Sequence, residues 1–209
     1  MTTIPIASTG YRAQSVTTVL TYRPLDLNDY LNNRGTSMPD DTGSGQFNVW
    51  GNSIPADHLP LPGSQVDVDG VPFILPAPSG EGDNIRCHGQ YIRLEPGRYD
   101  WIYLLAASER RTEEQVALHY ADHSVDFEAL RVSDFWAEAA PAFGERLAFR
   151  TPVMHYPYHV QRQVSALIWF QRVPVTRAAA LVGLRLPRNV AVHVFALTLQ
   201  GSATGEDHR

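Results

Sequence analysis

The sequence predicts one all-β domain of the antiparallel β-sandwich (jelly-roll) class. Short runs in which apolar and polar residues alternate, the signature of strands, recur between clusters of Gly, Pro, Asn and Asp. No window of about 18 residues keeps the period of an amphipathic helix. Only Phe135–Ala142 is compatible with a single helical turn, which Pro141 would end. Many short strands without intervening helices predict a sandwich.

The expected strands lie between these turn-forming clusters. They span Ser15–Tyr22, Gln46–Trp50, Gln65–Val68, Val71–Leu75, Asn84–His88, Gln90–Leu94, Tyr99–Ala106, Gln115–Tyr120, Val125–Val132, Arg146–Arg150, Val164–Gln171, Ala180–Leu184 and Val190–Leu199. Both faces of Val190–Leu199 are largely apolar, which predicts a strand in the centre of a sheet.

Turn residues predict how some of these strands are connected. Asp69-Gly70 supplies two residues that tolerate the positive φ of a tight hairpin turn. Asp122-His123 lies between two alternating runs and predicts a second hairpin. Pro96-Gly97 predicts a turn before the strand that contains Trp101. Polar residues 39–45 are expected to form a loop inside the domain.

Length and composition are those of a single globular domain. The chain has 209 residues, of which 44% are hydrophobic and 19% are charged. A sandwich of this size folds around its own core without disulfides. We expect the domain to span residues 15–200, with flexible segments at 1–14 and 201–209.

Charge and targeting signals limit the partners that we expect. The net charge of -5 argues against nucleic acid, and no apolar run is long enough to span a membrane. The first ten residues do not resemble a signal peptide, and the single cysteine, Cys87, is expected to be a buried apolar residue, so we expect a cytoplasmic protein. All 17 basic residues are Arg, which is typical of a GC-rich bacterial, for example actinobacterial, genome. A homodimer is left open as the oligomeric state.

Several short motifs occur in an order found in one known kind of module. They are Asn32-Asn33-Arg34-Gly35, Ser53-Ile54-Pro55-Ala56, Gly70-Val71-Pro72-Phe73, Asp83-Asn84 and Gly89-Gln90-Tyr91-Ile92. This order resembles the non-catalytic β-sandwich modules appended to bacterial glycoside hydrolases, which are similar to the galactose-binding-domain superfamily. The match covers about residues 25–132 and departs from the modules at Asn48-Val49-Trp50-Gly51, where they carry Asp-Gly.

The resemblance implies a bound sugar and a structural calcium ion. Within residues 26–33, hard oxygen ligands of the kind that calcium prefers occur at Asp26, Asn28, Asp29, Asn32 and Asn33. We therefore expect calcium as the possible cofactor, with Asp26, Asn28, Asp29 and Asn32 as its first candidates, and no organic cofactor.

A dense cluster of functional side chains spans Arg150–Arg162. In an extended segment His155 and His159 would lie on one face, with Tyr156 and Tyr158 on the other. Imidazole and phenol groups can transfer protons near neutral pH, so His155, Tyr158 and His159 are the catalytic candidates. Pro157 excludes the helix on which this His spacing would be a persuasive metal site.

The candidates for ligand binding are aromatic and arginine side chains. Trp and Tyr rings stack on sugars, and Arg grips carboxylate or phosphate groups in a bidentate way. They are Trp50, Trp101, Arg110, Arg111, Tyr156 and Arg162. His119 and Asp122 lie close enough in sequence to suggest a base and the group that orients it.

Two functions remain open at this stage. The first is a stand-alone carbohydrate-binding-like sandwich that binds a sugar or sugar-like small molecule. The alternative is a cofactor-free acid/base enzyme (a cyclase, isomerase or dehydratase) that acts on a secondary-metabolite intermediate in a bacterial pathway. A deep pocket around the His/Tyr cluster would favour the enzyme, and a shallow aromatic surface on the sandwich would favour binding.

Overall fold

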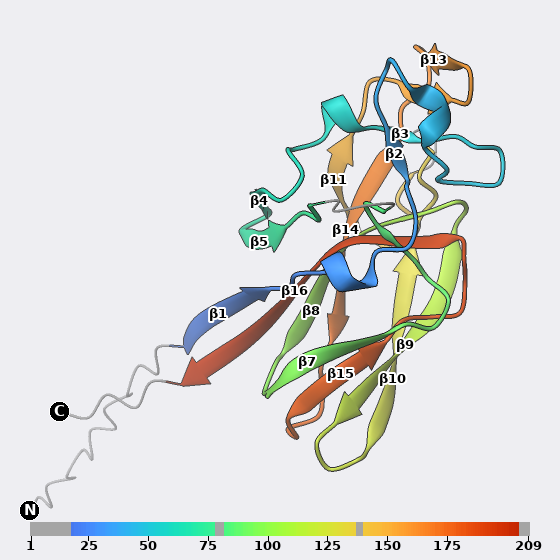
Figure 1. Cartoon of the computed structure of the whole chain (residues 1–209). Helices are drawn as coiled ribbons and strands as arrows, with labels where there is room; N and C mark the ends of the chain where they lie inside the picture. The colour runs from blue at the N-terminus through green and yellow to red at the C-terminus, as the bar shows by residue number, and fades with distance from the viewer. Residues whose placement is uncertain (1–17, 78–81, 137–139, 205–209) are drawn as a thin grey trace, which may run out of the picture.

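The structure is a computed structural model that describes residues 18–77, 82–136 and 140–204, and these parts fold as two packed β-sheets with short hairpins beside and above them (Figure 1). The larger sheet contains, in spatial order, β1 (Thr18–Pro24), β16 (Val192–Thr204), β8 (Trp101–Ser108), β14 (Leu167–Pro174) and β11 (Arg146–Arg150), with β6 (Ile85–Arg86) also paired to β16. The smaller sheet contains β10 (Val125–Val132), β9 (Thr112–Tyr120), β15 (Leu181–Arg185) and β7 (Tyr91–Gly97).

The remaining elements are short. Two hairpins are formed by β4 (Gln65–Val68) with β5 (Val71–Ile74) and by β12 (Met154–Tyr156) with β13 (His159–Gln161), while β2 (Thr36–Ser37) pairs in parallel with β3 (Ile54–Pro55). Single 3-10 turns are η1 (Asn28–Tyr30), η2 (Thr42–Ser44) and η3 (Ala56–His58). Within the described ranges, no helix is long and apolar enough to cross a membrane.

The long strands follow jelly-roll order. Apart from the edge strand β11 and the short β6, the strands of the two sheets are, along the chain, β1, β7, β8, β9, β10, β14, β15 and β16. In the larger sheet the order is β1, β16, β8 and β14, which are the first, eighth, third and sixth of these strands. In the smaller sheet the order is β10, β9, β15 and β7, which are the fifth, fourth, seventh and second. This order is that of two interlocked Greek keys. The predicted antiparallel β-sandwich (jelly roll) is therefore confirmed.

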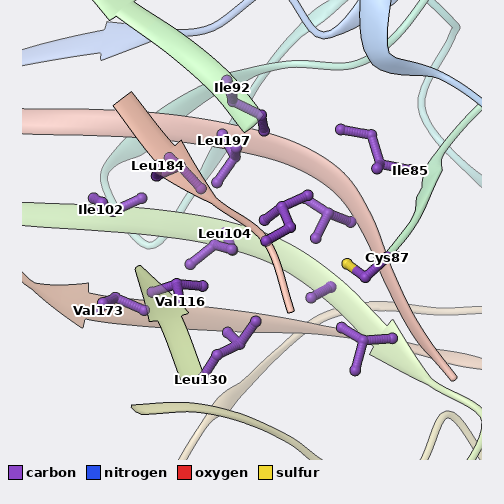
Figure 2. Packing of buried hydrophobic residues seen from close by; sticks show 14 of the residues in the cluster. Ile85, Cys87, Ile92, Ile102, Leu104, Val116, Leu130, Val173, Leu184 and Leu197 are labelled. Atoms are coloured by element: carbon purple, nitrogen blue, oxygen red, sulfur yellow. The ribbon is translucent and has the colours of Figure 1, made fainter. Parts of the chain in front are cut away.

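The main core lies between the two sheets. Ile102, Leu104 and Leu197 of the larger sheet and Val116 and Leu184 of the smaller sheet are each at most 2% exposed and point into the same layer (Figure 2). Burying each of these side chains stabilises the fold by about 1.5–3 kcal/mol. The period-two alternation in the sequence therefore marks the faces that meet.

A second core covers the opposite face of the larger sheet. Phe170 and Phe195 of this face pack with Phe47 and with Phe73 of β5, whose ring meets the Phe170 ring edge-on at 6.0 Å. The strand β16 therefore lies between two apolar layers and between the strands β1 and β8. This confirms the central position predicted for residues 190–199, although β16 continues to Thr204 because it pairs with β1.

The hairpin predictions are confirmed by backbone geometry. Asp69 and Gly70 have φ of 55° and 78° in the β4–β5 turn, and His123 has φ of 67° between β9 and β10. The turn predicted at Pro96-Gly97 is wrong, because β7 continues to Gly97. The strand tolerates Pro96 because β7 is at the edge of its sheet, where a missing N–H costs no ladder bond.

Two further local predictions differ from the structure. Residues 46–50 are a turn rather than a strand, because Asn48 Oδ1 accepts hydrogen bonds from the backbone N–H of Trp50 and of Asn52, both at 3.1 Å. The Asn48 side chain thereby supplies the hydrogen-bond acceptor that a neighbouring strand would otherwise offer to these N–H groups. The helical turn expected within residues 135–142 falls partly outside the described residues, and the described Trp136 instead forms a β-bridge with Ala166.

Two of the five motifs, Asn32–Gly35 and Asp83-Asn84, meet around Asp83. Its carboxylate accepts hydrogen bonds from the backbone N–H of Gly35 at 2.8 Å and of Thr36 at 3.0 Å, and from Asn84 Nδ2 at 2.7 Å. Asn33 and Asn84 also form a β-bridge. A Cβ atom at position 35 would lie 2.5 Å from Asn84 Nδ2, so the motif needs glycine there. These residues join the loop before β2 to the segment that enters β6.

Candidate functional site

The cluster predicted to carry catalysis folds as the β12–β13 hairpin. Tyr156 pairs with His159, and the chain reverses at Pro157-Tyr158. The extended segment that would place His155 and His159 on one face is therefore a wrong expectation. His155 is fully buried, whereas His159 is exposed and Tyr158 is 96% exposed.

His155 belongs to a buried polar chain. Its Nδ1 atom lies 2.8 Å from Ser37 Oγ, which in turn lies 2.6 Å from Ser53 Oγ. Burial lowers the pKa of His155, so the imidazole is neutral at pH 7. Its Nε2 atom has no hydrogen-bond partner among the described residues. The chain joins β2, β12 and the residue before β3, and the structure does not bring His155, Tyr158 and His159 into one pocket, so their catalytic role stays a prediction.

The predicted ligand-binding residues are spread over several elements. Trp50 is 71% exposed. Its loop packs against the β12–β13 hairpin, as shown by the neighbouring Gly51, where an added Cβ would lie 3.0 Å from Pro157 Cγ. Tyr156 stacks on the His159 ring at 5.2 Å. Further exposed positions are Arg162, which follows β13, and Arg110 and Arg111, which lie in the turn between β8 and β9. Trp101 begins β8 and lies beneath the guanidinium of Arg172.

The residues predicted to bind calcium make hydrogen bonds within and between loops. Asp26 Oδ1 accepts a hydrogen bond from the backbone N–H of Asn28. Asn28 Oδ1 accepts a hydrogen bond from the backbone N–H of Ala77. Asn32 Oδ1 accepts from the backbone N–H of Arg86 at 2.7 Å. Asp29 is exposed beside them. Within the described ranges no group of three or more His, Cys, Asp or Glu side chains could hold a metal. The calcium site, which would also use amide oxygens, stays a prediction.

The suggested His119–Asp122 pair does not form. The Asp122 carboxylate accepts hydrogen bonds from the backbone N–H and the hydroxyl of Ser124, at 3.0 and 2.5 Å. The ring of His119 instead meets the ring of Tyr91 edge-on at 5.1 Å.

The structure assembles a different site, a hollow of about 360 Å³ on the outer face of the larger sheet, which we call the aromatic pocket. Its floor is a row of rings from three strands. Tyr103 of β8 stacks on Phe170 of β14 at 5.4 Å with 16° between the planes, and Tyr22 of β1 lies 6.4 Å from Tyr103. The remaining lining residues are Asp69, Val71, Phe143, Gly144, Glu145, Arg146, Gln171 and Arg172.

Two arginines flank this floor. Arg146 is placed 5.7 Å above the Phe170 ring and forms a 3.0 Å ion pair with Asp69 of the β4–β5 turn. Arg172 lies directly opposite Tyr103 in the sheet and 4.5 Å above the Trp101 ring. No carboxylate of the described residues lies within 4.0 Å of the Arg172 guanidinium, so this side chain keeps donors free for a ligand.

The pocket offers hydrogen-bond acceptors as well as donors. Glu145 is buried and accepts from the backbone N–H of Ser133 at 3.0 Å and of Phe143 at 2.8 Å, which leaves part of its acceptor capacity free. Burial, together with Tyr22, raises the pKa of Tyr103, although Arg172 opposes this shift, so the phenol stays protonated at neutral pH, and its hydroxyl donates to Gln200 Oε1 at 3.4 Å. A flat aromatic floor with polar walls suits a ligand that is apolar on one face and hydroxylated at its edge.

A scan against protein-family models matches residues 21–203 to the model described as AziU2-like beta-sandwich domain. This range runs from β1 to β16 and so includes both sheets and the aromatic pocket. The chain belongs to the AziU2-like β-sandwich family. A search of curated proteins found no match to the chain.

None of the residues that line the pocket in this AziU2-like sandwich was among the site residues predicted from the sequence. The signal was present in part, because Trp101-Ile102-Tyr103 and Trp169-Phe170-Gln171-Arg172 place aromatic residues beside polar ones. The alternation of side chains assigns Tyr103 to one face of β8 and Phe170 to one face of β14. That these two faces belong to the same sheet, with Tyr22 beside them, depends on the pairing of β1, β16, β8 and β14.

Proposed function

We propose that this protein is a galactose-binding-like β-sandwich that binds a sugar or sugar-like small molecule in the aromatic pocket. The observation that carries the proposal is the row of rings in the pocket, in which Tyr22 and Tyr103 are half-buried and Phe170 is buried beneath Arg146, with Arg172 on the other side. A site with aromatic rings on the outer face of a sandwich supports binding over catalysis, whereas the predicted catalytic residues are divided between a buried core and an exposed turn.

The ligand would lie with an apolar ring face on Tyr103 and its hydroxyl groups toward the arginines. Arg172 donates hydrogen bonds from a planar fork, and the Asp69 and Glu145 carboxylates accept them from hydroxyl groups. The volume of about 360 Å³ falls within the range of about 300–1,000 Å³ that is usual for small-molecule pockets. A more apolar hollow, between Leu59, Phe149 and Phe195, has only about 70 Å³ and is too small for such a ligand.

The test is a titration of the full chain with D-galactose and its methyl glycosides, in which binding is measured by isothermal titration calorimetry and by backbone amide NMR shifts. We expect saturable binding with shifts in β8 and β14, weakened about tenfold or more in Arg172→Gln because a charge-assisted hydrogen bond is lost. The control Arg98→Gln removes an exposed arginine that does not line the pocket. Absence of saturable shifts, or equal binding by the Arg172→Gln variant, would refute the proposal.

The same pocket gives a physical basis for the alternative, a cofactor-free acid/base enzyme. Tyr103 is held as a neutral phenol in a hollow that also contains the Asp69 and Glu145 carboxylates, so an acid and a base would flank a bound ligand. A secondary-metabolite intermediate would then be converted by a cyclase, isomerase or dehydratase reaction. Enzyme activity is supported if a ligand that binds is recovered with a changed structure and if Tyr103→Phe abolishes that change while binding persists. Recovery of the unchanged ligand supports the binding protein.

A further inference from the structure

The outer face of the smaller sheet carries a second hollow, which neither the sequence motifs nor the aromatic pocket explains. It has a volume of about 590 Å³. We call it the sheet groove and define it by a floor of Ala117 and Ala129, walls of Phe127, Arg131 and Arg185, and Arg188 at one end. Small residues on two adjacent strands, with long side chains around them, make the sheet surface concave at this point.

Arg185 is held in place by its neighbours. Its Nη1 atom donates a 2.9 Å hydrogen bond to the carbonyl of Gly89, and its guanidinium lies 5.5 Å above the Tyr91 ring. Tyr91 in turn packs on Gly183, where a Cβ atom would collide with its hydroxyl group. The edge of its ring meets His119. This stack fixes the cation before any ligand arrives, which lowers the entropic cost of binding.

The charge of the groove favours an anion. Its lining holds Arg131, Arg185 and Arg188 against Glu113 and Glu114. Arg131 is already paired with Glu113 at 3.3 Å, and Glu114 accepts a hydrogen bond from Asn189. For Arg185 and Arg188, by contrast, no carboxylate in the described part of the chain lies within 4.0 Å.

The groove also offers an apolar surface beside these cations. Phe127 is 65% exposed on β10, directly opposite the floor residue Ala117 of β9. An aromatic or alicyclic ring would cover Phe127 while its anionic substituent reached a guanidinium. We propose that the sheet groove binds a small molecule that carries a phosphate or carboxylate group on a ring. The site is independent of the aromatic pocket, because it lies on the other sheet.

The test is an amide NMR titration of the full chain at constant ionic strength with phenyl phosphate, with benzoate, with inorganic phosphate and with phenol. We expect saturable shifts in β9, β10 and β15 with at least one of the two ring-bearing anions. Inorganic phosphate should bind at least tenfold more weakly than the better ring-bearing anion, and phenol should give no saturable shifts. Arg185→Gln should weaken binding about tenfold to a hundredfold, as expected for a charge-assisted hydrogen bond. Phe127→Ala should weaken it severalfold.

Matched controls separate the groove from the rest of the surface. Arg93→Gln removes an exposed arginine of the same sheet, Val125→Ala shortens an exposed residue two positions from Phe127, and Arg172→Gln alters the aromatic pocket. All three should bind like the wild type. The proposal is overturned if neither ring-bearing anion gives saturable shifts, if Arg185→Gln binds like the wild type, or if inorganic phosphate binds equally well. It is also overturned if sedimentation shows a dimer that Phe127→Asp dissociates, since a second copy of the chain would then occupy the groove.

Discussion

The buried imidazole of His155 should make the protein sensitive to acid, and the substitution His155→Asn tests this. Burial lowers the pKa of His155 below its ordinary value of 6.5, so the unfolded chain takes up a proton first as the pH falls. Stability is therefore present above pH 6.5 and is lost as the pH falls from 6.5 toward the folded-state pKa. Asn retains a polar atom for the hydrogen bond with Ser37 but does not titrate.

The size of the effect has an upper limit. One pKa unit corresponds to about 1.36 kcal/mol, so this histidine accounts for at most about 2 kcal/mol between pH 6.5 and about pH 5. His193, which is also fully buried and has its pKa lowered by burial, contributes a loss in the same direction to both proteins. The free energy of unfolding of His155→Asn should thus be lower at pH 7 and fall less steeply toward pH 5.

Urea unfolding across this pH range, monitored by tryptophan fluorescence, to which the buried Trp169 contributes, measures both slopes. His123→Asn is the matched control, because its side chain is exposed, and should keep the wild-type slope. If His155→Asn has the same slope as the wild type, the imidazole does not titrate as a buried group and the argument fails.

Three further predictions concern the cores and loops. Leu104→Ala in the main core should lower the free energy of unfolding by about 2–5 kcal/mol in urea titrations, and a loss below 1 kcal/mol would show that the core is loosely packed. Because burial raises the pKa of Cys87, a thiol reagent should modify it only in urea, and rapid modification of the native protein would contradict its burial. If calcium binds at Asp26–Asn32, added calcium should raise the melting temperature and EDTA should lower it, whereas an unchanged melting temperature would count against the site.

The sites show how far local sequence could predict function. The spacing of His155 and His159 predicts that they share one face only if the segment is extended. The segment is not extended, because the chain reverses at Pro157-Tyr158. Conversely, the aromatic residues that precede Arg172 were only a partial signal, and its position over Trp101 follows from the pairing of β14 with β8. The functional candidates therefore depended on strand pairing that no single segment specifies.

The sequence alone determined the elements whose causes are local. Alternating side chains marked most long strands, and Asp69-Gly70 marked a hairpin because few other residue pairs tolerate positive φ. The apolar character of both faces of residues 190–199 placed that strand at the centre. Only the tertiary structure decided that Tyr22, Tyr103 and Phe170 share one surface and that His155 is buried, because both results require segments far apart in the chain to pair in one register.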